Sequence, residues 1–150
     1  SWEILEAAAN RLKRWQMAAD LVWQKNQFEL VELDIEAMKG QLLDAMSSNL
    51  NTPKTLALVD AHLTEIAATE VNDNNREAVR SYFMLIEGIL GLKILGDDLT
   101  AEQRQLLLQR QDARSTQRWD ESDRLRKELE QNGIGVKDTS RGQQWFRLTH

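Results

Sequence analysis

The sequence contains no cysteine, one proline and two histidines among its 150 residues. Without cysteine it can form no disulfide framework, no thiolate metal site and no thiol nucleophile. The two histidines, His62 and His150, lie far apart in the chain, which gives little support to an imidazole-based metal centre. One proline and seven glycines are too few for the many turns of a β-sandwich or barrel. These deficits favour a helical protein.

Positive charge is also scarce, since the formal net charge is −5. Only residues 101–150 reverse the balance, with ten Lys and Arg against eight Asp and Glu. Non-specific binding to nucleic acid depends on neutralising phosphates, so any such role must be local and lie in this last third. The most apolar stretch, Tyr82 to Leu95, is interrupted by Glu87 and Lys93 and is too short to span a bilayer. We expect a cytoplasmic protein with neither a membrane nor DNA as a partner.

Four stripes of apolar residues with helical spacing occupy the first hundred residues. Polar breaks at 47–49 and 72–75 separate them, and Asn51-Thr52-Pro53 is typical of a helix start. The pattern predicts an antiparallel helix bundle over residues 1–96, with His62 at its surface. The stripes are Leu5, Ala8, Leu12, Trp15, Ala19 and Val22; Val31, Ile35, Met38, Leu42 and Met46; Leu56, Val59, Leu63 and Ile66; and Val79, Phe83, Ile86 and Leu90.

The pattern changes after Gly96. Thr100 and Gln103 fit a capping box that opens a fifth helix towards Arg114. A sixth helix is predicted from about Trp119 to Gln131, ended by Gly133, and two short strands follow around a turn at 141–142. The predicted fold class is therefore all-α: an antiparallel helix bundle over 1–96, followed by a small αα-ββ C-terminal module over 97–150.

The residues show no nucleophile–base constellation, no phosphate-binding loop and no metal-ligand spacing. Carboxylates are plentiful, but on amphipathic helices they usually form solvated faces. The chain by itself therefore has no predicted catalytic centre, and we expect no catalytic residue, metal ligand or cofactor in this segment.

One face of the predicted sixth helix carries a more specific pattern. Trp119, Asp123 and Arg126 follow each other at i, i+4 and i+7 and share a face, beside the separate apolar stripe of Leu125 and Leu129. Trp119 could pack into the groove between the fifth and sixth helices. It could instead be a stacking platform for an unpaired RNA base, with a polar reader next to it.

Trp145 allows the same two interpretations. For this residue we favour the core, because a hairpin needs an anchor against the helices.

The chain resembles cysteinyl-tRNA synthetase (cysteine–tRNA ligase) in its C-terminal helical bundle and anticodon-binding region. Upstream, 49–53 with Leu56 is similar to the family's D-[FL]-N-T-P-x-A-L motif, and 90–92 to its L-G-[IL] helix end. The specific part is the terminal motif, carried by Asp112, Ala113, Arg114, Trp119, Ser122, Asp123, Arg126, Leu129, Gly133, Ile134, Val136, Asp138, Thr139, Gly142 and Trp145. One departure is Arg118, which stands where the family often has a helix-capping Asp or Asn.

The resemblance implies a DALR-like bundle over 1–96 and an anticodon-recognition module over 97–150. It implies that Arg114, Trp119, Asp123 and Asp138 bind RNA and read the G-C-A anticodon of cysteine tRNA. The implied partners are the anticodon loop of that tRNA and the upstream catalytic domain of the same enzyme. ATP and zinc would belong to that parent class I cysteine–tRNA ligase, whose nucleotide-binding and zinc-binding signatures this chain lacks.

Two alternatives of another class remain at the level of sequence. The chain could be a helical protein-interaction module, or a free-standing relative without tRNA binding. Binding to a cysteine tRNA transcript, compared with one altered only in the anticodon, discriminates between these two alternatives and the anticodon-binding hypothesis.

Overall fold

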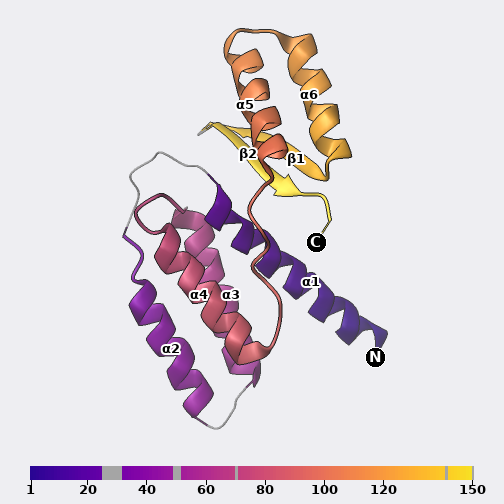
Figure 1. Cartoon of the computed structure of the whole chain (residues 1–150). Coiled ribbons are helices and arrows are strands. Elements are labelled where there is room, and N and C mark those ends of the chain that lie inside the picture. Colours follow the sequence, from indigo (N-terminus) through magenta and orange to yellow (C-terminus); the bar gives the residue numbers. More distant parts are fainter. Residues whose placement is uncertain (25–31, 49–51, 70, 141, 150) are drawn as a thin grey trace. The chain divides into compact units, whose positions relative to one another are not determined.

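A computed structural model describes residues 1–24, 32–48, 52–69, 71–140 and 142–149 (Figure 1). The chain divides into two compact units, Ser1–Gly96 and Asp97–His150. The predicted fold class is confirmed, because a helical bundle is followed by two helices and a two-stranded antiparallel hairpin. Of the residues named above, Val31, Asn49, Asn51, Arg141 and His150 lie outside the described part of the chain.

The first unit is a bundle whose helices begin at side-chain caps. The hydroxyl of Ser1 accepts from the backbone N–H of Ile4, and the carboxylate of Asp34 accepts from that of Ala37. α3 contacts α1 and α2, while α4 contacts α2 and η1. In Figure 1, α2, α3 and α4 lie side by side. The elements are α1 (Trp2–Ala19), the 3-10 turn η1 (Asp20–Trp23), α2 (Ile35–Ser47), α3 (Thr52–Thr69) and α4 (Arg76–Leu90).

The core of this unit contains one face of each helix, as the apolar stripes predict. It also takes in Val71, Ile94 and Leu95 from the segments that flank α4. The buried cluster comprises Trp15, Ala19, Val22, Ile35, Met38, Leu42, Val59, Leu63, Ile66, Val71, Val79, Tyr82, Phe83, Ile86, Ile94 and Leu95.

The first stripe is only half buried, which corrects the expectation for Leu5 and Ala8. Both are exposed, as are all of residues 1–10. Leu12 is partly buried, and Trp15 is the first fully buried residue of α1. The indole N–H of Trp15 donates to Asp60 on α3 at 2.6 Å, which fixes the C-terminal half of α1 against the bundle. Periodicity shows that a helix is amphipathic, but it does not show how far along the helix the partner surface extends.

His62 is buried, so the prediction that it lies at the bundle surface is wrong. Its Nδ1 lies 2.6 Å from the hydroxyl of Tyr82 on α4, and its Nε2 lies 2.8 Å from Oε1 of Gln41 on α2. Burial raises the pKa of Tyr82, so its hydroxyl keeps its proton and can donate to Nδ1. The neutral imidazole with a proton on Nε2 then satisfies both contacts.

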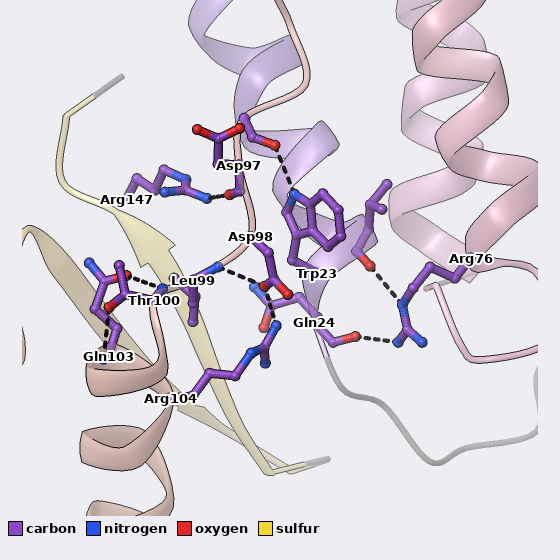
Figure 2. A network of polar contacts seen from close by, with 12 residues as sticks. Trp23, Gln24, Arg76, Asp97, Asp98, Leu99, Thr100, Gln103, Arg104 and Arg147 are labelled. Carbon is purple, nitrogen blue, oxygen red and sulfur yellow. Dashed lines mark hydrogen bonds and ion pairs between the residues drawn. The ribbon is translucent and has the colours of Figure 1, made fainter.

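Polar contacts hold the ends of the bundle segments in place (Figure 2). The guanidinium of Arg76, at the start of α4, donates to the backbone carbonyls of Val22 and Gln24, each at 2.7 Å. The indole N–H of Trp23 donates to the carbonyl of Gly96 at 3.0 Å. These side chains satisfy carbonyls at the end of η1 and at the end of the unit, where no helix supplies a partner.

The second unit contains α5 (Ala101–Ser115), α6 (Trp119–Gln131), β1 (Ile134–Thr139) and β2 (Gly142–Arg147). The predicted capping box is confirmed: Thr100 accepts from the backbone of Gln103 at 3.1 Å, and Gln103 accepts from that of Thr100 at 2.9 Å (Figure 2). The predicted end of the sixth helix is also confirmed, since α6 ends at Gln131 and Gly133 follows with φ of +79°.

The hairpin packs one face against the helices of its own unit. Leu125 and Leu129 are buried as predicted, together with Ile134 of β1 and Trp145 of β2. The core assignment of Trp145 is therefore confirmed. β1 pairs with β2 in a register that sets Val136 opposite Trp145 and Asp138 opposite Gln143. This register brings Asp138 to the inner side of the hairpin, since alternate residues share a face.

The buried imidazole predicts a stability that falls in mild acid. Burial lowers the pKa of His62, against a smaller opposing effect of Glu65. As the pH falls below about 6.5, the ordinary pKa of histidine, the imidazole of His62 therefore binds a proton more readily in the unfolded chain than in the folded one. The contribution of the neutral His62 to the free energy of unfolding is fully present above that pH. It is lost as the pH falls towards the lower pKa that His62 has in the folded state. Urea unfolding between pH 7.5 and 5.5 measures this slope.

The control is His62→Gln, which keeps hydrogen-bonding capacity but cannot titrate in this range. The variant is expected to be less stable at pH 7.5 and to lose the part of the slope that belongs to His62. An unchanged slope in the variant would contradict the prediction.

Candidate nucleic-acid interface

The turn between α5 and α6 determines where Trp119 begins the sixth helix. The backbone N–H of Arg118 donates to the carbonyl of Ala113 at 2.7 Å, and that of Gln117 donates to the carbonyl of Arg114 at 3.1 Å. These two bonds form a Schellman motif, in which the residue after the helix cap adopts a left-handed conformation. Gln117 holds this position with φ of +58°, where glycine is the usual residue.

α6 begins without a side-chain cap. Arg118 stands at the capping position and makes no side-chain capping bond, which agrees with its departure from the family pattern. Its guanidinium instead donates to Asp112 at 2.6 Å and to the hydroxyl of Thr116 at 2.9 Å. The first turn of α6 carries the acidic side chains of Asp120 and Glu121, which complement the positive end of the helix.

Trp119 lies at the surface and not in the groove between α5 and α6. It is 53% exposed, and the guanidinium carbon of Arg114 lies 5.4 Å from the centre of its ring. Such a cation–π contact at an exposed site is worth about 0.5–1 kcal/mol, enough to favour one arrangement of both side chains. The structure thus presents a half-exposed aromatic ring beside a guanidinium.

Asp138 lies at the centre of three arginines. Its carboxylate accepts two bonds from Arg110, at 3.0 and 2.9 Å, and one from Arg126 at 3.2 Å. Nε of Arg114 lies 3.3 Å from the same group. The hydrogen bonds from Arg110, together with the charges of the three arginines, hold the pKa of Asp138 below its usual range against the effect of burial. The group is therefore ionised at neutral pH.

Asp123 differs from Asp138, since it has no ion-pair partner among the described residues. It is exposed, and within the described ranges it makes no ion pair and accepts no side-chain hydrogen bond. It lies one turn after Trp119 on α6, so the two side chains project from the same face. A carboxylate in this state has both oxygens available to a ligand.

Three of the four predicted site residues are thus connected, in the order Trp119, Arg114, Asp138. Asp123 shares the helix face of Trp119 but is not bonded to the others. The arrangement offers an aromatic face, guanidinium donors and one free carboxylate, which are the groups that bind unpaired bases and phosphates.

Arg110 and Gln143 were missed by the sequence prediction. Arg110 is 1% exposed, and besides Asp138 it donates to Oε1 of Gln143 at 2.5 Å. The signal was present, since Arg110 lies at helical spacing between the buried residues Leu106 and Ala113. A charged residue in an apolar stripe indicates a buried ion pair, because an unpaired charge is costly in a core.

No group of three or more His, Asp or Glu in the described part of the chain could hold a metal ion. None of its helices is both long enough and apolar enough to cross a membrane.

The described geometry defines a class: a helical bundle followed by a helix–helix–hairpin domain that presents a Trp, Arg and Asp surface suited to RNA bases. Residues 96–145 match the family described as the cysteinyl-tRNA ligase anticodon binding domain. This match confirms the resemblance seen in the sequence.

Curated relatives extend the similarity to almost the whole chain. The chain is 28% identical to a cysteine–tRNA ligase of an Exiguobacterium species over 99% of its own length and 35% of the relative. It is 28% identical to that of Porphyromonas gingivalis over 95% of its length and 32% of the relative. It is 27% identical to that of Lactobacillus gasseri over 95% of its length and 33% of the relative. The chain spans about a third of the length of these relatives.

The left-handed Gln117 predicts a simple gain in stability. Gln117→Gly removes the Cβ that makes this conformation unfavourable and should stabilise the second unit by about 0.5–1 kcal/mol. Gln117→Ala keeps the Cβ and is the matched control, expected to give no gain. Thermal unfolding followed by circular dichroism measures both variants. Equal changes in the two would show that the turn conformation is not the cause.

Proposed function

We propose that this chain is the tRNA anticodon-binding region of a cysteine–tRNA ligase. In this proposal it recognises the G-C-A anticodon of cysteine tRNA for an intact enzyme that attaches cysteine to tRNA using ATP. The single observation that carries the proposal is the half-exposed Trp119, flanked by Arg114 and Asp123, within a domain of the anticodon-binding family.

The chemistry of each group suits an unstacked anticodon loop. The ring of Trp119 gives a base the aromatic face that it loses when it leaves the stack. The free carboxylate of Asp123 can accept from N1–H and the N2 amino group of guanine, an edge that adenine does not present. Arg114 can donate to a phosphate or to a base acceptor through a planar fork.

The division of labour follows the two units. We propose that residues 97–150 carry anticodon recognition and that residues 1–96 form the DALR-like bundle of the enzyme. The exposed Trp2, Ile4 and Leu5 of α1 favour a contact with a further part of the enzyme, and the partner we propose is its catalytic domain. The cytoplasm, where tRNA is charged, is the proposed location.

ATP and zinc belong to that catalytic domain in this proposal. The donor set of the present chain does not suit zinc, because the sequence has no cysteine and the described residues hold no cluster of three potential ligands. No step of the reaction is therefore assigned to residues of this chain, whose contribution is to bind and position the tRNA.

The first test replaces the stacking platform. Trp119→Ala should weaken binding to a cysteine tRNA anticodon stem-loop by about 1–3 kcal/mol, the range for one lost base stack. The loss should be similar for a loop with adenine in place of guanine, because every base has a stackable face. Fluorescence anisotropy at low, stated salt measures both affinities.

The matched control is Trp2→Ala, the same change at a tryptophan that is 80% exposed in the other unit. It should leave both affinities as they are. If Trp119→Ala binds both loops as the parent does, stacking on this residue is refuted, and a protein-interaction module becomes the better explanation.

The second test concerns the base edge. Asp123→Asn nearly preserves shape but gives up the double acceptor, so affinity for the G-C-A loop should fall about 10-fold or more, the cost of one good bidentate contact. Affinity for the loop with adenine should barely change. The control, Asp120→Asn, removes the same charge from another exposed position on α6. A loss that is equal for both loops would contradict base reading by Asp123.

A further inference from the structure

The first position of α6 lacks the kind of side chain that a helix start favours. Arg118 holds the capping position and makes no side-chain capping bond. A guanidinium group has no acceptor atom, so it cannot take a hydrogen bond from the N–H groups of the first turn, as Ser, Thr, Asp or Asn can. In the same unit, α5 begins with a complete capping box at Thr100. The residue at position 118 therefore does not serve the stability of its own helix.

Two hydrogen bonds hold the guanidinium of Arg118 in place. Nη2 donates to Oδ2 of Asp112 at 2.6 Å, and Nε donates to the hydroxyl of Thr116 at 2.9 Å. Nη1 donates to no residue in the described part of the chain, and the side chain is 52% exposed. An ion pair between two exposed side chains contributes little to stability. Its effect is to order a guanidinium that still has donors to spare, which lowers the entropy lost when a ligand binds.

The same turn presents both Arg118 and the exposed aromatic ring. Arg118 directly precedes Trp119, the first residue of α6. Its partner Asp112 lies near the end of α5, two residues before Arg114, whose guanidinium carbon lies 5.4 Å from the centre of the indole ring. The two guanidinium groups are therefore anchored at the end of one helix, where the ring begins the next.

A cation at this position matters because the turn is otherwise acidic. Residues 112–123 contain four acids and two bases. One base, Arg114, faces the carboxylate of Asp138 through Nε at 3.3 Å. Arg118 is the other base, and it offsets the repulsion that the acids exert on an approaching phosphate. The acids are Asp112, Asp120, Glu121 and Asp123.

We propose that Arg118 binds a phosphate of the RNA loop whose base stacks on Trp119, and that the helix cap is given up in favour of this contact. The inference rests on the proposed function and adds a residue to it. Every nucleotide carries the same phosphate, so Arg118 strengthens binding without reading a base. Its role thus differs from that of Asp123, whose contribution depends on the base.

Arg118→Asn tests this exchange, because it should change stability and binding in opposite directions. Asn caps a helix, so the midpoint of thermal unfolding of the second unit should rise by a few degrees. Affinity should fall by the same factor for the G-C-A loop and the loop with adenine, about 5-fold to 10-fold at roughly 50 mM salt. The slope of log affinity against log salt should become shallower by about 0.7, the value for one contact to a single strand. Circular dichroism measures the midpoint, and fluorescence anisotropy measures the affinities.

Two further variants separate the charge from the cap. Arg118→Gln removes the charge without supplying a preferred capping residue, so affinity should fall as in Arg118→Asn while the midpoint does not rise. Arg118→Lys keeps the charge and should keep the parental salt slope.

The matched control is Arg124→Gln, which removes the same charge from another exposed position on α6. Arg124 is 58% exposed and is paired with Glu121 and Glu128. At about 100° per residue it projects about 140° away from Trp119 around the helix. Its removal should leave the salt slope as it is.

The outcomes separate this inference from the proposed function. The inference is overturned if Arg118→Asn keeps the parental salt slope and affinity, since the position is then only structural. It is also overturned if Arg124→Gln weakens binding as much as Arg118→Gln, since net charge then explains the effect. The proposed function alone fails if the parent chain binds the two loops with equal affinity while the Arg118 variants still show the shallower slope. A parent chain that binds neither loop at low salt overturns both.

Discussion

The second unit depends on one partly buried ion pair, between the inaccessible Arg110 of α5 and Asp138 of β1. Both guanidinium Nη groups of a nearly inaccessible arginine donate to one carboxylate, so moving the carboxylate away would leave the buried charge of Arg110 uncompensated. Because the carboxylate comes from the hairpin and the arginine from a helix, the pair fixes the register of the hairpin against α5. It also places the carboxylate where Arg126 of α6 can reach it. All three layers of the unit meet at this group.

The surface around Trp119 follows from that fixed point. Arg114 lies between Asp138 and the indole ring, so the ion pair determines one side of the aromatic surface. The turn at Gln117 determines the other, because it sets the direction in which α6 leaves α5. The left-handed residue is a local strain, of a kind that persists where the surrounding structure over-determines it. A stacking platform needs this rigidity, since a ring that must be ordered at binding loses part of the stacking energy.

Local signals in the sequence predict much of this unit, whereas long-range pairing is less accessible. The ends of α5 and α6 follow from Thr100, Gln103 and Gly133, whose preferences act within a few residues. The errors concern distant partners. Leu5 lies on a helical stripe but finds no surface to cover it, and His62 is buried because Tyr82 and Gln41 come from two other helices. For Asp138, family resemblance indicates a functional position, but only the structure shows that its carboxylate accepts hydrogen bonds from Arg110 and Arg126.

Charge is distributed in a way that favours selective over general binding. The chain as a whole is acidic, with a net charge of −5, which disfavours general binding to nucleic acid. Around Asp138, however, three guanidinium groups share one carboxylate, which leaves a local excess of positive charge next to an exposed aromatic ring. In the proposed function, a phosphate is attracted next to a ring on which a base can stack, and the carboxylate of Asp123 disfavours loops whose base edge offers it no donor. In the proposed function, discrimination would therefore come from repulsion as well as from contact, within a chain that is acidic as a whole.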